Sequence, residues 1–262
     1  MNQIFGVCNL SLVPLRAEPS DRSEMVSQLL FGDHFKILEK KESWILILTS
    51  YDDYKGWIDF KQYAEVDFAT FEILNKQQTI IGFNIHQAVQ NIATGEVLNL
   101  VAASYLPAYQ NGKFYIGKTF YSTLLPALMP DINLFSSKIS EAAYFYLNTP
   151  YLWGGRSPFG IDCSGFCQMV FKQFAIKLKR DAWQQAEQGD MVNFLQEAQP
   201  GDLAFFDNAE GKIVHVGMML NNNQIIHASG RVKIDRIDTE GIYSSELKKY
   251  THKLRIIKRY YP

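Results

Sequence analysis

The chain is poor in cysteine, with only Cys8, Cys163 and Cys167 among its 262 residues. Three cysteines cannot form a closed set of disulfides in a chain this long, and two thiols four residues apart on a helix usually stay reduced. No run of about 18 apolar residues occurs, and the first residues, MNQIFGVCNLSLVPLRAEPS, lack the basic start and apolar stretch of a secretory signal. These absences predict a soluble, cytoplasmic protein. A periplasmic protein whose signal had been replaced by an engineered Met1 would give the same sequence.

An excess of charge of one sign is also absent, because 26 Lys and Arg against 27 Asp and Glu leave a net charge of −1. Without an overall field, neither nucleic acid nor a membrane is expected as a partner, and we expect a monomer. Apolar residues, in contrast, make up 47% of the chain, enough for a substantial core and more than one domain. The basic stretch KKYTHKLRIIKRYY near the C-terminus alternates charged and apolar residues, which predicts a half-exposed strand.

Short β-type runs separated by turn residues fill roughly the first 125 residues. Their spacing of about ten residues predicts two small all-β barrels, over residues 1–66 and 67–127. Helical spacing of apolar residues begins in SSKISEAAYFYLNTP, so we place a third domain at 128–262. The predicted strands are MVSQLLF, HFKILEK, SWILILT and GWID in the first barrel and FEILNK, TIIGF, VLNLVAASY and KFYIG in the second.

The stretch GIDCSGFCQMVF predicts a helix that begins at Cys163, with Asp162 as its N-cap. Apolar residues recur three and four positions apart from Cys163 to Phe174, so one face of this helix would be buried. Three strand-like runs follow, DLAFFD (202–207), IVHVGMML (213–220) and QIIHAS (224–229), and the last two would form a hairpin. A helix set against an antiparallel sheet predicts an α+β domain.

A cysteine at the start of a helix can act as a nucleophile, because free amides and the helix dipole lower the pKa of its thiol and can hold an oxyanion. To cleave an amide bond, the thiol also needs an imidazole, which His215 or His227 could supply. If Leu220 pairs with Gln224, His227 lies opposite Gly217 and diagonal to His215, so both rings share one face of the sheet.

Two other interpretations remain open at this stage. Cys163 alone on an apolar face is more often a packing residue, and the spacing of Cys163, His215 and His227 makes catalysis and packing about equally well supported. A zinc site made of Cys163, Cys167, His215 and His227 is disfavoured, because the second thiol would lie one turn deeper in the buried face. Cys167 is better interpreted as a packing residue.

The motifs YLWGGRSPFGIDCSGF, QPGDLAFF, HVGMML and IIHASG, in this order over roughly residues 135–260, resemble the NlpC-type family of papain-like cysteine peptidases that cut peptidoglycan peptides. This resemblance implies a catalytic Cys163, a base His215, and His227 as the residue that orients the base. The N-terminal half is similar to the bacterial SH3-like (SH3b) barrels of the γ-D-glutamyl-L-diamino acid endopeptidases, on the motifs LRAEPSDRSEMVSQLLFGD and DDYKGWID.

In that subgroup the substrate has a free amino end, L-Ala-γ-D-Glu-diamino acid. The resemblance implies that Asp162, Ser164, Tyr151 and Trp153 surround the L-Ala end, and that a barrel tyrosine, Tyr54, closes the site. Each has a plainer interpretation: Asp162 as a helix cap, Trp153 as core packing and Tyr54 as a barrel residue. One departure from the family is Ala182 in RDAWQQA, where the family often has Ser.

The sequence therefore predicts a cysteine peptidase that hydrolyses the γ-D-glutamyl–diamino acid bond of short wall peptides, with no metal or other cofactor. It does not distinguish diaminopimelate from lysine. The alternatives are an inert wall-peptide binding protein, a hydrolase of intact murein, or an acyltransferase that uses the same residues.

Overall fold

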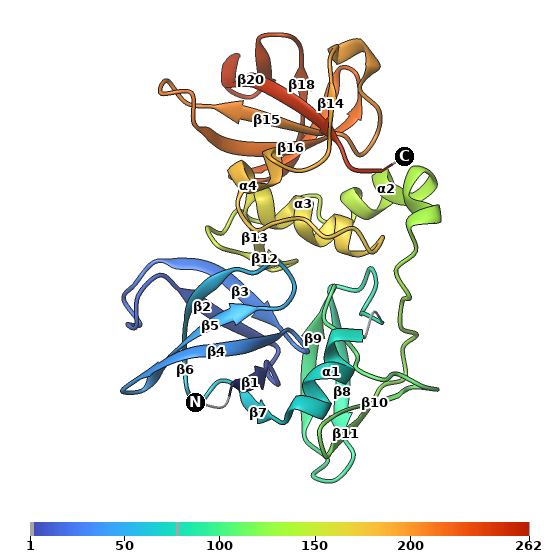
Figure 1. Ribbon diagram of the computed structural model, residues 1–262. Coiled ribbons are helices and arrows are strands. Elements are labelled where there is room, and N and C mark those ends of the chain that lie inside the picture. The colour runs from blue at the N-terminus through green and yellow to red at the C-terminus, as the bar shows by residue number, and fades with distance from the viewer. Residues whose placement is uncertain (1–2, 77–78, 262) are drawn as a thin grey trace. The chain divides into compact units, whose positions relative to one another are not determined.

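The computed structural model describes residues 3–76 and 79–261, and the chain divides into two compact units (Figure 1). Unit 1 contains the residues up to Pro130 together with Arg156–Pro158, and unit 2 contains Asp131–Gly155 and Phe159–Pro262. Arg156 groups with unit 1 because its buried guanidinium donates to the Asp33 carboxylate at 3.1 Å and to the carbonyl of Gln28 at 2.6 Å. The predicted start of the C-terminal domain, residue 128, lies close to the division at Pro130.

Unit 1 begins with a seven-stranded antiparallel sheet in the order β3-β2-β6-β5-β4-β1-β7. The alternation of partly buried and fully buried residues in strands such as β5 places one face on an aliphatic core that includes Val13, Leu15 and Ile47. The strands are β1 (Ile4–Val7), β2 (Leu12–Arg16), β3 (Met25–Leu30), β4 (His34–Lys41), β5 (Trp44–Thr49), β6 (Lys55–Asp59) and β7 (Ala64–Val66).

The second half of unit 1 differs from the predicted barrel. FEILNK, predicted as a strand, lies in helix α1 (Phe68–Lys76), because Asp67 accepts a hydrogen bond from the backbone N–H of Thr70, as an N-cap does, and Phe71 and Leu74 bury one face. The predicted strand TIIGF is reduced to isolated bridges at Ile80. The strands that follow are β8 (His86–Asn91), β9 (Val97–Val101), β10 (Lys113–Ile116) and β11 (Thr119–Ser122), paired in the order β10-β11-β8-β9.

A single hydrophobic cluster joins these two halves of unit 1. Val7 and Phe31 from the first sheet pack in the same cluster as Leu74 of α1 and Leu100 and Phe114 of the four-stranded sheet. The structure therefore does not confirm a second barrel of the SH3 type. It shows a helix and a small sheet that share their core with the seven-stranded sheet.

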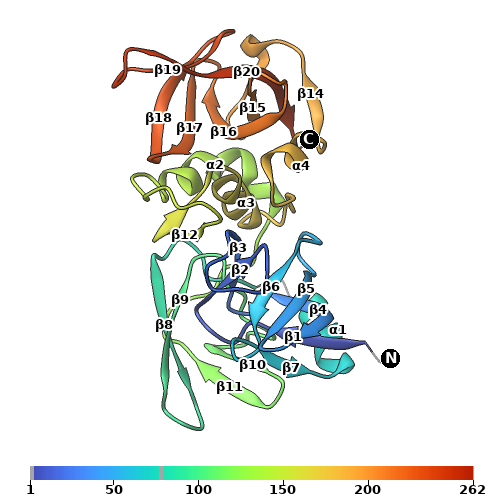
Figure 2. The same ribbon diagram turned by 90° about the vertical axis from the view of Figure 1, so that its left-hand side faces the viewer.

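Unit 2 contains helices on one side of a β-barrel, as Figures 1 and 2 both show. Strands β15 to β19 pair consecutively, and β20 pairs with both β19 and β15, which closes a six-stranded antiparallel ring. Strand β14 is added beside β20. The strands are β12 (Arg156–Ser157, within unit 1), β13 (Gly160–Ile161), β14 (Asp190–Val192), β15 (Leu203–Asp207), β16 (Ile213–Asn221), β17 (Gln224–Ser229), β18 (Arg231–Ile237), β19 (Gly241–Ser244) and β20 (Lys249–Arg259).

The helices of unit 2 pack their apolar faces inward. Helix α3 (Cys163–Lys172) is buried along its whole length and contacts β16 and β17. The others are η1 (Ile132–Leu134), α2 (Phe135–Tyr144), α4 (Ala182–Ala186) and η2 (Leu195–Glu197). The predicted strands 202–207, 213–220 and 224–229 correspond to β15, β16 and β17, and the basic C-terminal stretch forms β20. Within the described ranges, no helix combines the length and the apolar character needed to cross a membrane.

Candidate active site

Cys163 is the first residue of α3, and its side chain is only 7% exposed. Asp162 caps the helix, with its carboxylate accepting a hydrogen bond from the backbone N–H of Gly165 at 2.6 Å. The backbone of Val216, the residue after His215 in β16, hydrogen-bonds to the Cys163 sulfur. The capped helix end therefore places this thiol against the strand that carries the predicted base. Cys167 lies one turn deeper and is fully buried, as expected of a packing residue.

The predicted low pKa of the Cys163 thiol is not found. Burial, reinforced by the charge of Asp162, raises the pKa of Cys163 to about 12, although hydrogen bonds from the backbone of Val216 and Ser164 oppose this shift. Loss of water around the sulfur outweighs the helix amides on which the prediction rested. The resting site therefore holds a neutral thiol, which needs a base to become a nucleophile.

The register of β16 and β17 places the two histidines as predicted, with one difference at the turn. Met218 pairs with Ile226, so Gly217 comes opposite His227 and both imidazoles share one face. The predicted Leu220–Gln224 pair is wrong, because a bulge leaves Leu220 unpaired in the ladder and Asn221 pairs with Gln224 instead. The extra residue of the bulge offsets the one-residue shift of the closing pair, so the register at the histidines is the predicted one.

Gly217 makes room for His227. A Cβ atom added at Gly217 would lie 2.8 Å from the Cβ of His227 and 2.7 Å from a methyl group of Ile225. These distances are shorter than side-chain contacts normally allow. Only glycine at this position lets the two strands carry both imidazoles without a shift.

A chain of hydrogen bonds runs from His215 into the protein interior. Nε2 of His215 lies 2.9 Å from Nδ1 of His227, and Nε2 of His227 lies 3.1 Å from a carboxylate oxygen of Asp235. Lys233 forms an ion pair with the same oxygen at 3.1 Å. Burial raises the pKa of Asp235, but hydrogen bonds from His227 and Lys233 more than offset this and lower it overall. Asp235 is therefore a carboxylate at neutral pH.

This carboxylate fixes the tautomers of both imidazoles. A carboxylate only accepts hydrogen bonds, so Nε2 of His227 carries the proton and its Nδ1 is an acceptor. That acceptor requires a proton on Nε2 of His215, which leaves Nδ1 of His215 with a free lone pair. His215 is therefore arranged to take a proton through Nδ1.

Replacing Asp235 by asparagine is expected to lower kcat/KM by about 10- to 100-fold, the usual cost of losing a group that orients a functional histidine. The amide can donate to Nε2 of His227 and so favour the opposite tautomers. The measurement is the pH profile of kcat/KM together with ¹⁵N NMR of the imidazoles. Asp238→Asn, at an exposed carboxylate bonded to Tyr250, is the matched control, and equal activity of the two variants would show that Asp235 orients nothing.

A third imidazole completes this cluster. The ring of His252, from β20, stacks on His215 with centroids 4.1 Å apart and ring planes 25° apart. Burial, helped by nearby His227 and Lys233, lowers the pKa of His252 to about 4. Burial also lowers the pKa of His227, and it lowers that of His215 well below its usual value, with the two neighbouring imidazoles adding to the effect. All three rings are therefore neutral at pH 7.

These lowered pKa values predict that the folded state loses stability in mild acid. As the pH falls below about 6.5, histidines of the unfolded chain bind protons while the buried rings do not, so the free energy of unfolding falls with falling pH. For His252 the loss continues until the pH reaches its folded pKa, about 4. Urea denaturation between pH 7.5 and 5 checks this, and His252→Phe, which keeps a stacking ring, should show a shallower dependence than the wild type. An equal slope in both proteins would contradict the assignment.

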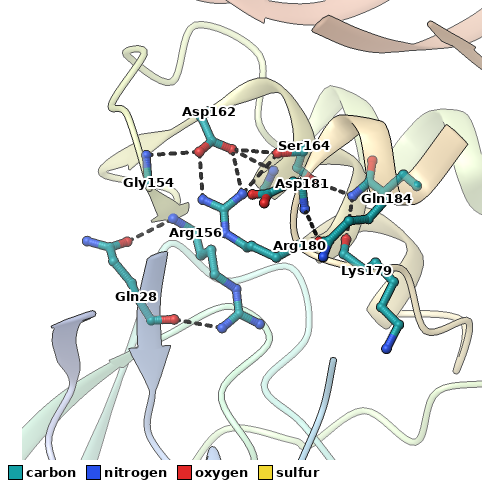
Figure 3. Close-up of polar contacts among 11 residues, drawn as sticks. Gln28, Gly154, Arg156, Asp162, Ser164, Lys179, Arg180, Asp181 and Gln184 are labelled. Atoms are coloured by element: carbon teal, nitrogen blue, oxygen red, sulfur yellow. Dashed lines mark hydrogen bonds and ion pairs between the residues drawn. The ribbon is translucent and has the colours of Figure 1, made fainter. Parts of the chain in front are cut away.

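Asp162 is the centre of a second buried network, shown in Figure 3. The Arg180 guanidinium, 1% exposed, donates to both carboxylate oxygens, at 2.6 and 3.1 Å, and to the hydroxyl of Ser164 at 2.9 Å. Asp162 also accepts hydrogen bonds from the backbone N–H groups of Gly154 and Gly165 and, more weakly, from Ser164. These donors already fill the roughly four lone-pair positions of a carboxylate. Through Asp162, the Gly154 hydrogen bond joins the start of α3 to the YLWGG segment, and the Arg180 ion pair joins it to the loop before α4.

The remaining predicted substrate residues lie in both units. Tyr151 is half-buried. Burial raises the pKa of its hydroxyl, and the charges of the nearby Cys163 and Asp162 add to this shift, so the Tyr151 hydroxyl lies close to the thiol. Trp153 is 59% exposed, which excludes the interpretation as core packing. Tyr54 lies in unit 1, where its ring packs against the barrel core. Ala182 begins α4 and is buried, so it offers no hydroxyl.

Three functional residues were missed by the sequence analysis: Asp235, Arg180 and His252. Asp235 and Lys233 lie on β18, whose register pairs Lys233 directly with His227, so the alternation of RVKIDRI was an available signal for Asp235. Arg180 lies two residues before α4, a helix that the sequence analysis did not predict, and it had no signal of its own. His252 is in the basic stretch that the sequence analysis interpreted only as a half-exposed strand.

Comparison with known proteins adds to this geometry. The family model "NlpC/P60 family" matches residues 148–255, and the model "Bacterial dipeptidyl-peptidase Sh3 domain" matches residues 15–62. The chain is 30% identical over 239 residues to the "Gamma-D-glutamyl-L-lysine dipeptidyl-peptidase" of Bacillus subtilis, covering 84% of this chain and 78% of the relative. With the "Probable endopeptidase p60" of Listeria seeligeri the identity is 43%, over only 39% of this chain and 20% of the relative.

A solved structure of an NlpC/P60 family protein from Bacillus cereus is similar to the whole chain. It covers 98% of this chain and 100% of its own, with a TM-score of 0.79 at 19% identity. At this identity the similarity supports the fold alone, including the SH3-like part.

Proposed function

Because this chain belongs to the NlpC/P60 family and is a cysteine peptidase, we propose that it hydrolyses the γ-D-glutamyl–diamino acid bond of short peptidoglycan peptides with a free N-terminal L-Ala. The extent of the similarity carries this proposal. The dipeptidyl-peptidase relative matches 84% of the chain, including the SH3-like region, whereas the p60 endopeptidase relative matches 39%. Relatives named gamma-D-glutamyl-L-lysine dipeptidyl-peptidase thus match most of the chain.

The buried residues of unit 2 supply the chemistry for this reaction. Nδ1 of His215 takes the proton of the Cys163 thiol as the sulfur attacks the γ-carbonyl carbon of D-Glu. The backbone N–H of Cys163, at the start of α3, stabilises the oxyanion, and His215 then gives its proton to the departing amine of the diamino acid. A water molecule, deprotonated by His215, hydrolyses the thioester and restores the thiol. His227, held by Asp235, keeps Nδ1 of His215 available and stabilises the imidazolium.

The Asp162 network supports recognition of the amino end. A buried carboxylate beside the nucleophile favours an α-ammonium group over an acylated nitrogen. The lone pairs of Asp162 are occupied, so an ammonium group would have to displace one of the weaker donors. The hydrogen bond from Ser164, at 3.3 Å, is the longest of these. Ser164 and Tyr151 would line the same end. The contribution of Trp153 and Tyr54 to the substrate site stays a prediction.

The decisive experiment is incubation with synthetic L-Ala-γ-D-Glu-L-Lys and with the diaminopimelate analogue, with products identified by mass spectrometry. We expect the dipeptide L-Ala-D-Glu and the free diamino acid as products. The ratio of the cleavage rates of the two peptides identifies the preferred third residue. Cleavage at another bond, or transfer of the acyl group to an added amine in preference to water, would refute the proposal. A free-peptide substrate would fit recycling of wall peptides in the cytoplasm.

A further inference from the structure

Three of the five histidines of the chain lie together in unit 2, although they come from three different strands. One ring nitrogen from each of His215, His227 and His252 lies within 4.8 Å of the others. His227 meets the other two rings edge-on, at centroid distances of 5.1 and 5.7 Å. All three ligands of this group are imidazoles, and neither Cys163 nor Cys167, which belonged to the zinc set disfavoured in the sequence analysis, is among them.

From this geometry we propose that His215, His227 and His252 form a binding site for a divalent cation of the zinc class, and that its occupation inhibits the peptidase. Zn²⁺ binds imidazole nitrogens at about 2.0–2.1 Å with tetrahedral angles, which separates two ligand nitrogens by roughly 3.3–3.4 Å. Nε2 of His215 and Nδ1 of His227 are 2.9 Å apart. To admit the ion in place of the shared proton, these two nitrogens separate by a few tenths of an ångström, and the His252 ring turns out of its stack on His215 so that its in-plane lone pair also points to the ion.

The groups behind two of these rings already have the arrangement that metal-bound histidines require. Such a histidine usually donates its second ring N–H to a carboxylate or another oxygen, which fixes the ring and its tautomer. Nε2 of His227 is bonded to Asp235, and Nδ1 of His252 lies 2.9 Å from the hydroxyl of Thr251. These contacts leave Nδ1 of His227 and Nε2 of His252 available. His252 is partly exposed, so the cluster is not sealed from solvent.

Occupation would stop the reaction by changing the tautomer of His215. In the metal-free site, Nε2 of His215 carries the proton and Nδ1 has the free lone pair. When Nε2 binds the cation, the ring stays neutral only if its proton moves to Nδ1, and no proton is lost. Nδ1 then becomes a donor and cannot accept the thiol proton. This inhibition rests on the proposed role of His215 as the base, whereas binding of the cation does not.

The test measures binding apart from activity. Cys163→Ala protein should bind one Zn²⁺ by calorimetry, and bound Co²⁺ should give a visible spectrum without the near-ultraviolet band of a cobalt–thiolate bond. In Cys163→Ala protein, the additional change His252→Asn should weaken Zn²⁺ binding by more than 10-fold. The additional change Thr251→Val should weaken it by about 10- to 100-fold. His86→Asn, at an exposed histidine of unit 1, is the matched control and should leave binding unchanged. Circular dichroism checks that each variant is folded.

Two outcomes would overturn the site. If Cys163→Ala abolished binding, the ion would sit on the thiol and not on the three histidines. If His252→Asn bound Zn²⁺ as tightly as the control, His252 would not be a ligand. In the wild type, Zn²⁺ should inhibit and EDTA should restore the rate. Tight binding without inhibition would instead keep the site and refute the role of His215 as the base.

Discussion

Replacing Cys163 by alanine should abolish hydrolysis of the tripeptide, with a loss on the order of 10⁴- to 10⁶-fold in kcat. The neighbouring hydroxyl of Ser164 cannot replace the thiol as nucleophile, because it is bonded to Arg180 and Asp162. The free energy of unfolding should change by no more than about 1–2 kcal/mol, since only one sulfur atom is removed. Single-turnover kinetics and urea denaturation measure the two effects separately.

Cys167→Ala is the matched control, because Cys167 is the second thiol of the same helix and is fully buried one turn further along. This variant should keep most of the activity and lose a comparable amount of stability. If both variants lost activity equally, the loss would reflect damage to α3, and Cys163 would not be the nucleophile.

The arrangement of Cys163, His215 and His227 could be predicted from the sequence because it depends on local signals. A capping Asp162 fixes where the helix begins, and the alternation along β16 and β17 fixes which residues share a face. The bulge at Leu220 did not spoil this prediction, because the extra residue offsets the one-residue shift of the closing pair from Leu220–Gln224 to Asn221–Gln224. Local capping and strand register were therefore sufficient for these three residues.

The pKa of Cys163 could not be predicted in the same way. The helix end is visible in the sequence, but the burial of the sulfur is a property of the folded unit, and burial dominates. The same holds for Arg180. Nothing in the local sequence shows that a guanidinium 18 residues from Asp162 is buried against it.

In the second half of unit 1, the sequence predicted a strand where the structure has a helix. FEILNK has β-type residues, yet Asp67 caps the helix that contains it. Phe71 packs on the Phe5 ring of β1 and Leu74 enters the shared core, so tertiary packing makes the segment helical. Propensity over six residues is a weak signal when a cap and a buried face both favour the helix.

The buried Asp162–Arg180 pair changes how amine recognition must be tested. Asp162→Ala would leave a guanidinium buried without its partner, and that alone costs several kcal/mol of stability. Asp162→Asn keeps a side-chain oxygen for Arg180 while removing the negative charge. Asp202→Asn is the matched control, because Asp202 is equally buried and is also bonded by two nitrogens of an arginine, Arg259.

The wild type should cleave L-Ala-γ-D-Glu-L-Lys faster than its N-acetylated form by several orders of magnitude in kcat/KM. Acetylation removes the positive charge and adds bulk, so the substrate can no longer replace the long Ser164 hydrogen bond to Asp162 with a charged one, a loss that discriminates more strongly than shape alone.

Asp162→Asn should narrow this ratio by at least about 10-fold, since one charged hydrogen bond is worth roughly 1.5–3 kcal/mol, whereas Asp202→Asn should lower stability and leave the ratio unchanged. Tyr54→Phe, which removes only the hydroxyl from a ring packed on the barrel core, should also narrow the ratio if Tyr54 contacts the amino end. Parallel measurements on both peptides give each ratio directly. Equal rates for the two peptides in the wild type, or rapid digestion of intact wall in which L-Ala is acylated, would mean that the enzyme does not recognise the amine and cuts wall peptides wherever the γ-D-glutamyl bond is accessible.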